Sequence, residues 1–171
     1  WVGMILFSLA FMFFSIGLAR PQIGAKLKEH QSKGAEVMIA LDVSNSMLAQ
    51  DYSPDRLQRA KLAISRLVDK LNGDRIGLVL FAGTSFVQLP ITTDYVSAKM
   101  FLGNISTESV PVQGTAIGDA INTCIKSFSA QSENSRAIIV ITDGENHEDD
   151  PVEAAKTAAS MGISVYTIGV G

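Results

Sequence analysis

The sequence contains only one cysteine, Cys124, which excludes an internal disulfide. A lone buried thiol is tolerated in reducing and oxidising compartments alike, so it does not identify the compartment. The net charge of −3 gives no reason to expect nucleic acid as a partner. No internal repeat or low-complexity segment is visible. About 150 residues remain beyond the apolar N-terminus, enough for one domain with a sizeable core.

Residues 2–19 contain no charged side chain. With Trp1 they make about 19 residues, or roughly 28 Å as a helix, close to the hydrocarbon thickness of a bilayer. We therefore predict a transmembrane helix over residues 1–19. A signal peptide is the alternative, but no charged n-region or A-x-A cleavage pattern is visible. A buried core helix is disfavoured because the segment is apolar all round.

Residues 20–34 form the expected juxtamembrane linker, with Arg20 and three lysines. The positive-inside rule would place this flank in the cytoplasm, but the opposite flank needed for the comparison is missing. Because Trp1 is not an initiator residue and the sequence stops just after a strand-like run, we expect a longer protein.

Apolar runs typical of buried strands alternate with amphipathic segments typical of helices beyond residue 35. The expected strands span residues 36–42, 76–82, 85–91, 137–142 and 163–168, and the expected helices 54–71, 94–102, 116–128 and 151–161. This alternation predicts an α/β sheet with helices on both faces. Only two residues separate the second and third strands, which is too short for a parallel crossover. The sheet should therefore be mixed, with the third strand antiparallel to the second, at an edge.

Asp42-Val43-Ser44-Asn45-Ser46 leaves the carboxyl end of the first strand. In open α/β sheets, ligands bind at that end. A carboxylate and two hydroxyls are hard oxygen donors, which suit Mg²⁺, Ca²⁺ or Mn²⁺ better than zinc or copper. The same residue types also serve as ordinary turn and cap residues, so five residues alone leave both interpretations open.

Two further residues belong with this motif. Asp143 ends another apolar strand at the same edge, and Thr115 precedes a helix. Asp42, Ser44, Ser46, Thr115 and Asp143 match, in type and order, the five metal residues of the von Willebrand factor A domain. The resemblance covers residues 35–171. Taken singly, Thr115 is also a possible N-cap and Asp143 a turn residue.

The resemblance implies a doubly wound, Rossmann-like sheet of order 3-2-1-4-5-6, with the final strand and helix missing from this sequence. It also implies a metal-ion-dependent adhesion site. The hydroxyls of Ser44, Ser46 and Thr115 would hold Mg²⁺, possible substitutes being Mn²⁺ and Ca²⁺, and the two aspartates would hold its waters. One position would remain for an Asp or Glu of a protein partner. We interpret the acidic loop over residues 145–150 as solvated, and expect it to repel strongly acidic partners.

A closer resemblance is to membrane-anchored Bat-type aerotolerance proteins of bacteria. It rests on residues 19–22, 44–49, 54–57, 74–77, 88–92 and 142–150. It implies a protein-binding module, and no enzyme, in an envelope complex linked to stress or oxygen tolerance. The expected partners include other A-domain proteins and a MoxR-type ATPase. The expected location is the bacterial inner membrane, with the domain on the periplasmic side.

Two alternatives remain open. A Mg²⁺-dependent phosphotransferase could use Asp42 as its nucleophile. Against it, the sequence shows no second acid two residues beyond Asp42, no clear lysine partner and no phosphate-cradling glycine loop. A metal-free scaffold with a vestigial site is the other alternative.

Overall fold

The computed structural model describes residues 1–18, 34–51, 53–129, 132, 134–144 and 149–171. The chain divides into two compact units, Trp1–Gln31 and Ser32–Gly171. The linker predicted over residues 20–34 lies, apart from Gly34, outside the described residues.

The described part of the first unit, residues 1–18, forms one helix, α1 (Val2–Leu18), with 17 residues. Its large apolar side chains, such as Met4, Phe7 and Phe13, are exposed. Within the described part of the chain, no helix reaches the length and hydropathy that mark a membrane span. The transmembrane role of this segment therefore stays a prediction.

The second unit is built on a sheet that has five strands in the described residues, in the order β3-β2-β1-β4-β5. These strands are β1 (Glu36–Asp42), β2 (Arg75–Phe81), β3 (Ser85–Thr92), β4 (Arg136–Thr142) and β5 (Ile163–Gly169). β1 lies parallel to β2 and β4, and β4 parallel to β5. β3 pairs antiparallel with β2, which confirms the prediction from the two-residue connection.

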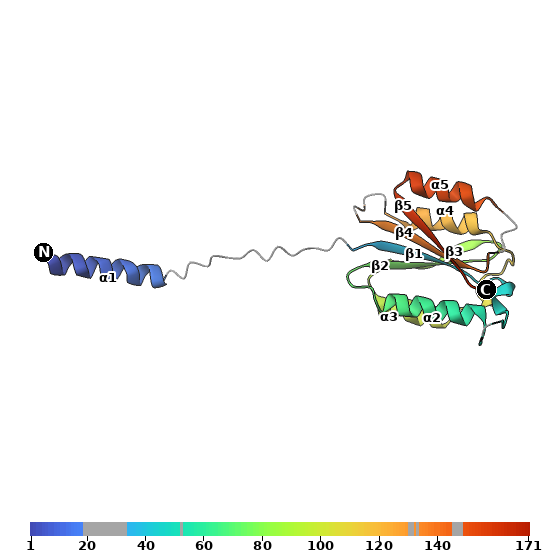
Figure 1. Ribbon diagram of the computed structural model, residues 1–171, viewed down its shortest axis with the longest axis horizontal. Helices are drawn as coiled ribbons and strands as arrows, with labels where there is room; N and C mark the ends of the chain where they lie inside the picture. The colour runs from blue at the N-terminus through green and yellow to red at the C-terminus, as the bar shows by residue number, and fades with distance from the viewer. Residues whose placement is uncertain (19–33, 52, 130–131, 133, 145–148) are drawn as a thin grey trace. The chain divides into compact units, whose positions relative to one another are not determined.

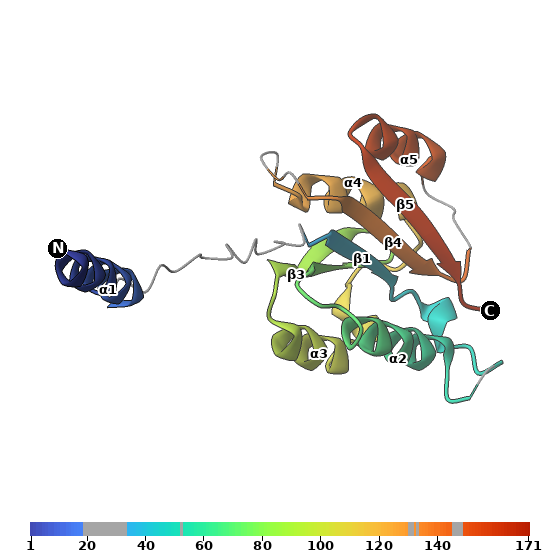
Figure 2. The same cartoon turned by 60° about the vertical axis from the view of Figure 1, so that its left-hand side comes forward.

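Two helices cover each face of the sheet (Figures 1 and 2). They are α2 (Arg56–Val68) and α3 (Tyr95–Gly103) on one face, and α4 (Ile117–Ser127) and α5 (Pro151–Ser160) on the other. Short 3-10 segments, η1 (Asn45–Leu48) and η2 (Thr107–Ser109), lie in the loops. The predicted α/β architecture with helices on both faces is therefore confirmed.

Aspartates begin three of these helices. Asp55 caps α2 by accepting the backbone N–H of Gln58 at 2.7 Å. Asp94 caps α3, and Asp150 caps α5. Ser53 is also a residue type that caps helices, but in the structure Asp55 takes the cap position of α2. A carboxylate just before the first helical residue reaches the free N–H groups and also complements the helix dipole.

β1 is buried along its whole length and separates two hydrophobic clusters. Ile39 and Leu41 pack beneath α2 and α3, whereas Met38 and Ala40 face α4 and α5. The alternation follows from the two-residue period of a strand. Because both faces are covered, polar side chains gather at the ends of the strands, and in such sheets ligands bind at the carboxyl ends, here those of β1 and β4.

Candidate metal centre

Asp42 is the last residue of β1 and is fully buried. Its Oδ1 accepts the backbone N–H of Ser44 at 2.8 Å, and its Oδ2 accepts the hydroxyl of Thr142 at 2.7 Å. The first bond closes a local turn, and the second joins the ends of β1 and β4. Both carboxylate oxygens are thus engaged by the protein.

Burial raises the pKa of Asp42 above its ordinary value. The hydrogen bonds from Ser44 and Thr142 favour the ionised form and oppose this rise, while the nearby charge of Asp143 adds to it. The two carboxylates are therefore close enough to repel each other. Such a pair is stabilised by a cation placed beside it.

Ser44 and Ser46 bring their hydroxyls together on the loop after Asp42. Their Oγ atoms are hydrogen-bonded to each other at 2.9 Å, with Ser44 buried and Ser46 partly exposed. Neighbouring ligands of an octahedral Mg²⁺, each at roughly 2.1 Å, stand roughly 3.0 Å apart. The hydroxyl pair therefore fits two adjacent positions of such an ion.

Thr115 is buried and reaches the same edge through backbone contacts. The N–H of Val43 donates to the carbonyl of Phe81 at 2.9 Å, and that of Ala116 donates to the carbonyl of Ala82 at 2.8 Å. Two consecutive residues at the end of β2, Phe81 and Ala82, thus bond to the segments that carry Asp42 and Thr115. The N-cap of α4 is Ala116, without a side-chain bond, so Thr115 does not serve as the helix cap.

Gln113 fastens the loop before Thr115 to the serine loop. Its Oε1 accepts the backbone N–H of Asn45 at 3.0 Å, and its Nε2 donates to the carbonyl of Thr107 at 3.2 Å. The close approach requires glycine at Gly83, because a Cβ there would stand 2.5 Å from the carbonyl oxygen of Gln113. The loop is therefore held by both side-chain and backbone contacts.

Asp143 follows β4, and its side chain is only 1% exposed. Its Oδ2 lies 3.2 Å from Nη1 of Arg56, the first residue of α2. Since Thr142 bonds to Asp42 and immediately precedes Asp143, both aspartates belong to one corner of the sheet. Figure 2 shows the arrowheads of β1, β4 and β5 ending at this same side.

The structure thus places all five predicted residues at the carboxyl edge of the sheet. Among the described residues, no group of three or more His, Cys, Asp and Glu could hold a metal, so any cation site here depends on the hydroxyls. Two carboxylates, two serine hydroxyls and a threonine are oxygen donors that suit a hard divalent ion. The donor chemistry fits; ligation itself stays a prediction.

Sequence reasoning missed Arg56, Gln113 and Thr142 as members of this centre. A hydroxyl directly before Asp143 was the available signal for Thr142, while Arg56 and Gln113 carried no periodic or spacing signal. In the acidic loop, residues 145–148 lie outside the described residues. Asp149 accepts the backbone N–H of Asp119 at 2.7 Å, at the start of α4, so it has a structural contact that the solvated-loop interpretation did not include.

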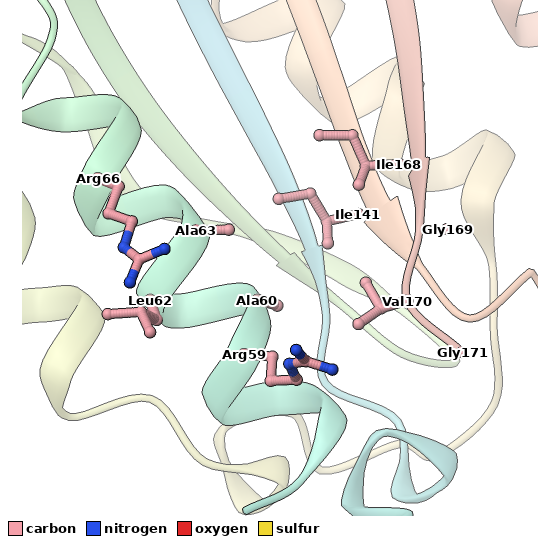
Figure 3. Close-up of a pocket in the computed structure, with 10 residues that line it drawn as sticks. All are labelled: Arg59, Ala60, Leu62, Ala63, Arg66, Ile141, Ile168, Gly169, Val170 and Gly171. Atoms are coloured by element: carbon pink, nitrogen blue, oxygen red, sulfur yellow. The ribbon is translucent and has the colours of Figure 1, made fainter. Parts of the chain in front are cut away.

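A groove of 560 Å³ lies between α2 and the ends of β4 and β5 (Figure 3). Leu62, Ile141, Ile168 and Val170 give it an apolar lining, and Arg59 and Arg66 add positive charge. No acidic or hydroxyl side chain is among the described residues that line it. The groove therefore offers a cation no ligands and is separate from the five-residue set.

Comparison with known families supports the sequence interpretation. The family model described as the von Willebrand factor type A domain matches residues 37–145. These residues include Asp42, Ser44, Ser46, Thr115 and Asp143. The chain spans about half the length of the curated relatives it matches. One, an uncharacterised protein of Borreliella burgdorferi, is 32% identical over 166 residues, which are 95% of this chain and 48% of that protein.

Two solved structures from Bacteroides are similar over most of the chain. An aerotolerance-related membrane protein of Bacteroides fragilis, with multiple mutations to serines, is 59% identical with a TM-score of 0.78, over 81% of this chain and 68% of that chain. The protein BatB of Bacteroides thetaiotaomicron is 62% identical with a TM-score of 0.77, over 80% and 66%. The resemblance to Bat-type proteins is therefore confirmed.

A more distant structure shares the fold alone. Proximal thread matrix protein 1 of the mussel byssus is 22% identical with a TM-score of 0.70, over 80% of this chain and 35% of that chain. That protein has a zinc-occupied metal-ion-dependent adhesion motif.

Proposed function

Because the chain belongs to the von Willebrand factor type A domain family, we propose that it binds a protein partner through a divalent cation at the edge of its sheet. The residues that would hold the cation are Asp42, Ser44, Ser46, Thr115 and Asp143. The partner would supply an Asp or Glu oxygen to the cation. The role would be performed in a bacterial envelope complex linked to stress or oxygen tolerance.

The observation that carries this proposal is the paired hydroxyls beside two buried carboxylates. Ser44 Oγ and Ser46 Oγ lie 2.9 Å apart, and Asp42 feels the charge of Asp143. Neutral hydroxyls bind a hard cation without cancelling its charge. The bound cation would then attract a carboxylate from outside, which is the chemistry it supplies.

We propose Mg²⁺ as the ion, with Mn²⁺ or Ca²⁺ as possible substitutes. All five side chains offer oxygen, and Mg²⁺ prefers oxygen donors and a regular octahedron. The zinc-occupied motif of the mussel protein supports a divalent site in this fold. Zinc favours nitrogen and sulfur ligands, which this set lacks, so we propose Mg²⁺ rather than zinc as the occupant here.

We propose binding as the role of this site, without catalysis. A phosphotransferase would need the carboxylate of Asp42 to be accessible to the phosphorus that it attacks. Both oxygens of Asp42 already accept hydrogen bonds, from Ser44 and Thr142, in a buried position. This arrangement suits a carboxylate that holds a loop and, through waters, a cation.

We also propose that α1 anchors the chain in the bacterial inner membrane, with the domain on the periplasmic side. The exposed apolar side chains of α1 support this, because apolar surface is unfavourable in water. The Bacteroides fragilis relative is itself described as a membrane protein. Extraction of membranes with alkaline carbonate tests the anchor, since a peripheral protein would be released into the soluble fraction.

A paired capture experiment tests the binding role. The tagged chain, incubated with solubilised membranes from its own cells, should retain partners in Mg²⁺ and lose them in EDTA. Other A-domain proteins and a MoxR-type ATPase are the partners we expect. Ser44→Ala should abolish capture in Mg²⁺, whereas Ser65→Ala, a serine on α2 far along the chain, should not. Equal capture by natural and Ser44→Ala chains would contradict the proposal.

A further inference from the structure

Arg56 contacts the metal centre from outside the five-residue set. It is the first residue of α2, and its side chain is 22% exposed. Its guanidinium meets two carboxylates, Asp51 and Asp143. Asp143 is one of the residues that would hold the cation, so Arg56 places a fixed positive charge beside the site.

Asp51 holds the guanidinium in a defined orientation. Nε of Arg56 lies 3.0 and 3.1 Å from the two oxygens of Asp51, and Nη2 lies 2.8 Å from Oδ2. Such a fork-to-carboxylate pair is geometrically specific. The remaining nitrogen, Nη1, is thereby directed at Oδ2 of Asp143, 3.2 Å away.

The backbone of Arg56 is also tied to the serine loop. Its N–H donates to the carbonyl of Ala49 at 3.2 Å, and the N–H of Ala49 donates to the carbonyl of Ser46 at 3.0 Å. Two hydrogen bonds therefore separate Arg56 from a residue that would bind the cation. The start of α2, which carries Arg56, is therefore tied to the loop that carries Ser44 and Ser46.

We propose that Arg56 is a positioning residue that competes with the divalent cation for Asp143. In the metal-free chain, its charge offsets the repulsion between Asp42 and Asp143 and keeps the loop in place. A divalent cation beside Asp143 is repelled by the guanidinium, and the contact between Arg56 and Asp143 must weaken as the cation binds. Arg56 thus lowers the affinity of the site for the free ion. This inference rests on the proposed function.

Removal of the charge should therefore strengthen cation binding. The Arg56 guanidinium and Mg²⁺ would share the buried carboxylate of Asp143, and at an effective dielectric constant of about 20 the two positive charges repel each other strongly. We therefore expect the Arg56→Gln variant to bind Mg²⁺ about tenfold more tightly than the natural chain. Arg56→Lys keeps a positive charge but loses the fork to Asp51, and should bind Mg²⁺ within about threefold of the natural chain.

Isothermal titration of the full chain with Mg²⁺ alone measures these affinities, and thermal melting in EDTA provides a second reading. Arg56→Gln should melt at a lower temperature in EDTA while gaining Mg²⁺ affinity, a combination that mere structural damage would not produce. Arg66→Gln removes the same charge from the exposed surface of α2, about 15 Å further along, and should leave the affinity unchanged.

The outcomes separate this inference from the proposed function. Mg²⁺ binding that Ser44→Ala abolishes, but that Arg56→Gln leaves equal or weaker, would overturn the role of Arg56 alone. Absence of Mg²⁺ binding by the natural chain and by both arginine variants would overturn the proposed function and this inference with it.

Discussion

The two ends of β1 each bury a carboxylate, but the protein treats them differently. Glu36 begins the strand, and its Oε1 accepts hydrogen bonds from Ser132 at 2.8 Å and Asn134 at 3.4 Å. Arg75, whose side chain is half exposed, lies 3.4 Å from the same oxygen. Oε2 has no hydrogen-bond partner among the described residues. At the other end, both oxygens of Asp42 are hydrogen-bonded.

The difference lies in what surrounds each carboxylate. Glu36 has a half-exposed arginine and two neutral donors, all at one of its oxygens. Asp42 has a second carboxylate nearby, Asp143, and a pair of hydroxyls on the next loop. Burial of two like charges is unfavourable unless cations accompany them, and here Arg56, through its contact with Asp143, supplies one positive charge for two carboxylates. We therefore expect the carboxyl end of β1 to respond to a divalent ion, and the amino end to respond only to loss of packing and hydrogen bonds.

Asp42→Ala should have the largest effect on stability. It leaves the N–H of Ser44 and the hydroxyl of Thr142 without their buried acceptor, which should lower the free energy of unfolding by about 3 kcal/mol. Mg²⁺ binding should be lost as well. Urea denaturation in EDTA and titration with Mg²⁺ measure the two effects. A variant that keeps natural stability would show that these hydrogen bonds do not hold the loop.

Glu36→Ala should cost about 2 kcal/mol, because the substitution removes an acceptor shared by several donors. Glu36→Gln, which keeps one carbonyl oxygen, should cost less. Neither variant should change the affinity for Mg²⁺, since Glu36 lies at the opposite end of the strand. The same denaturation and titration apply. A loss of Mg²⁺ affinity in Glu36→Gln would remove the distinction between the two ends.

Ser44→Ala should separate stability from binding most clearly. Ser44 is buried and its hydroxyl bonds to Ser46, so we expect a cost of about 1 kcal/mol, somewhat more than an exposed serine would show. Mg²⁺ binding should nevertheless disappear, because an octahedral ion tolerates a missing ligand badly. A collapsed melting curve in EDTA would indicate instead that the serine is structural.

The pH dependence of Mg²⁺ binding should give the smallest effect. Burial raises the pKa of Asp42 in the folded chain above its value in the unfolded chain. The contribution of Asp42 to folding stability is therefore greatest below the unfolded-state pKa and declines as the pH rises through the folded-state pKa. The cation needs the ionised carboxylate, so affinity should fall as the pH decreases through the range around that raised pKa. Titrations with Mg²⁺ across that pH range measure the change in affinity. The Glu36→Gln variant is the control, and its pH profile should match that of the natural chain. An affinity that stays constant would contradict the assignment.

Much of the fold could be predicted because its signals are local. Glu36–Asp42 was predicted with its observed bounds, since a continuous apolar run ended by Asp42 is a clear boundary. The antiparallel β3 followed from a two-residue connection that permits no crossover. The cap of α2 does not follow from local signals, because Ser53 and Asp55 are both good capping residues and only the folded backbone selects between them.

The sequence by itself determined which residues could form an oxygen-rich centre, since Asp42, Ser44 and Ser46 follow one strand and Asp143 follows another. Only the tertiary structure decided how those groups are paired. Thr142 lies 100 positions from the aspartate it bonds, and Arg56 lies 87 positions from Asp143. Such contacts arise because β1 and β4 are neighbours in the sheet and α2 begins beside their ends. No local pattern records that proximity, because the burial of the hydrophobic faces of the sheet brings these segments together.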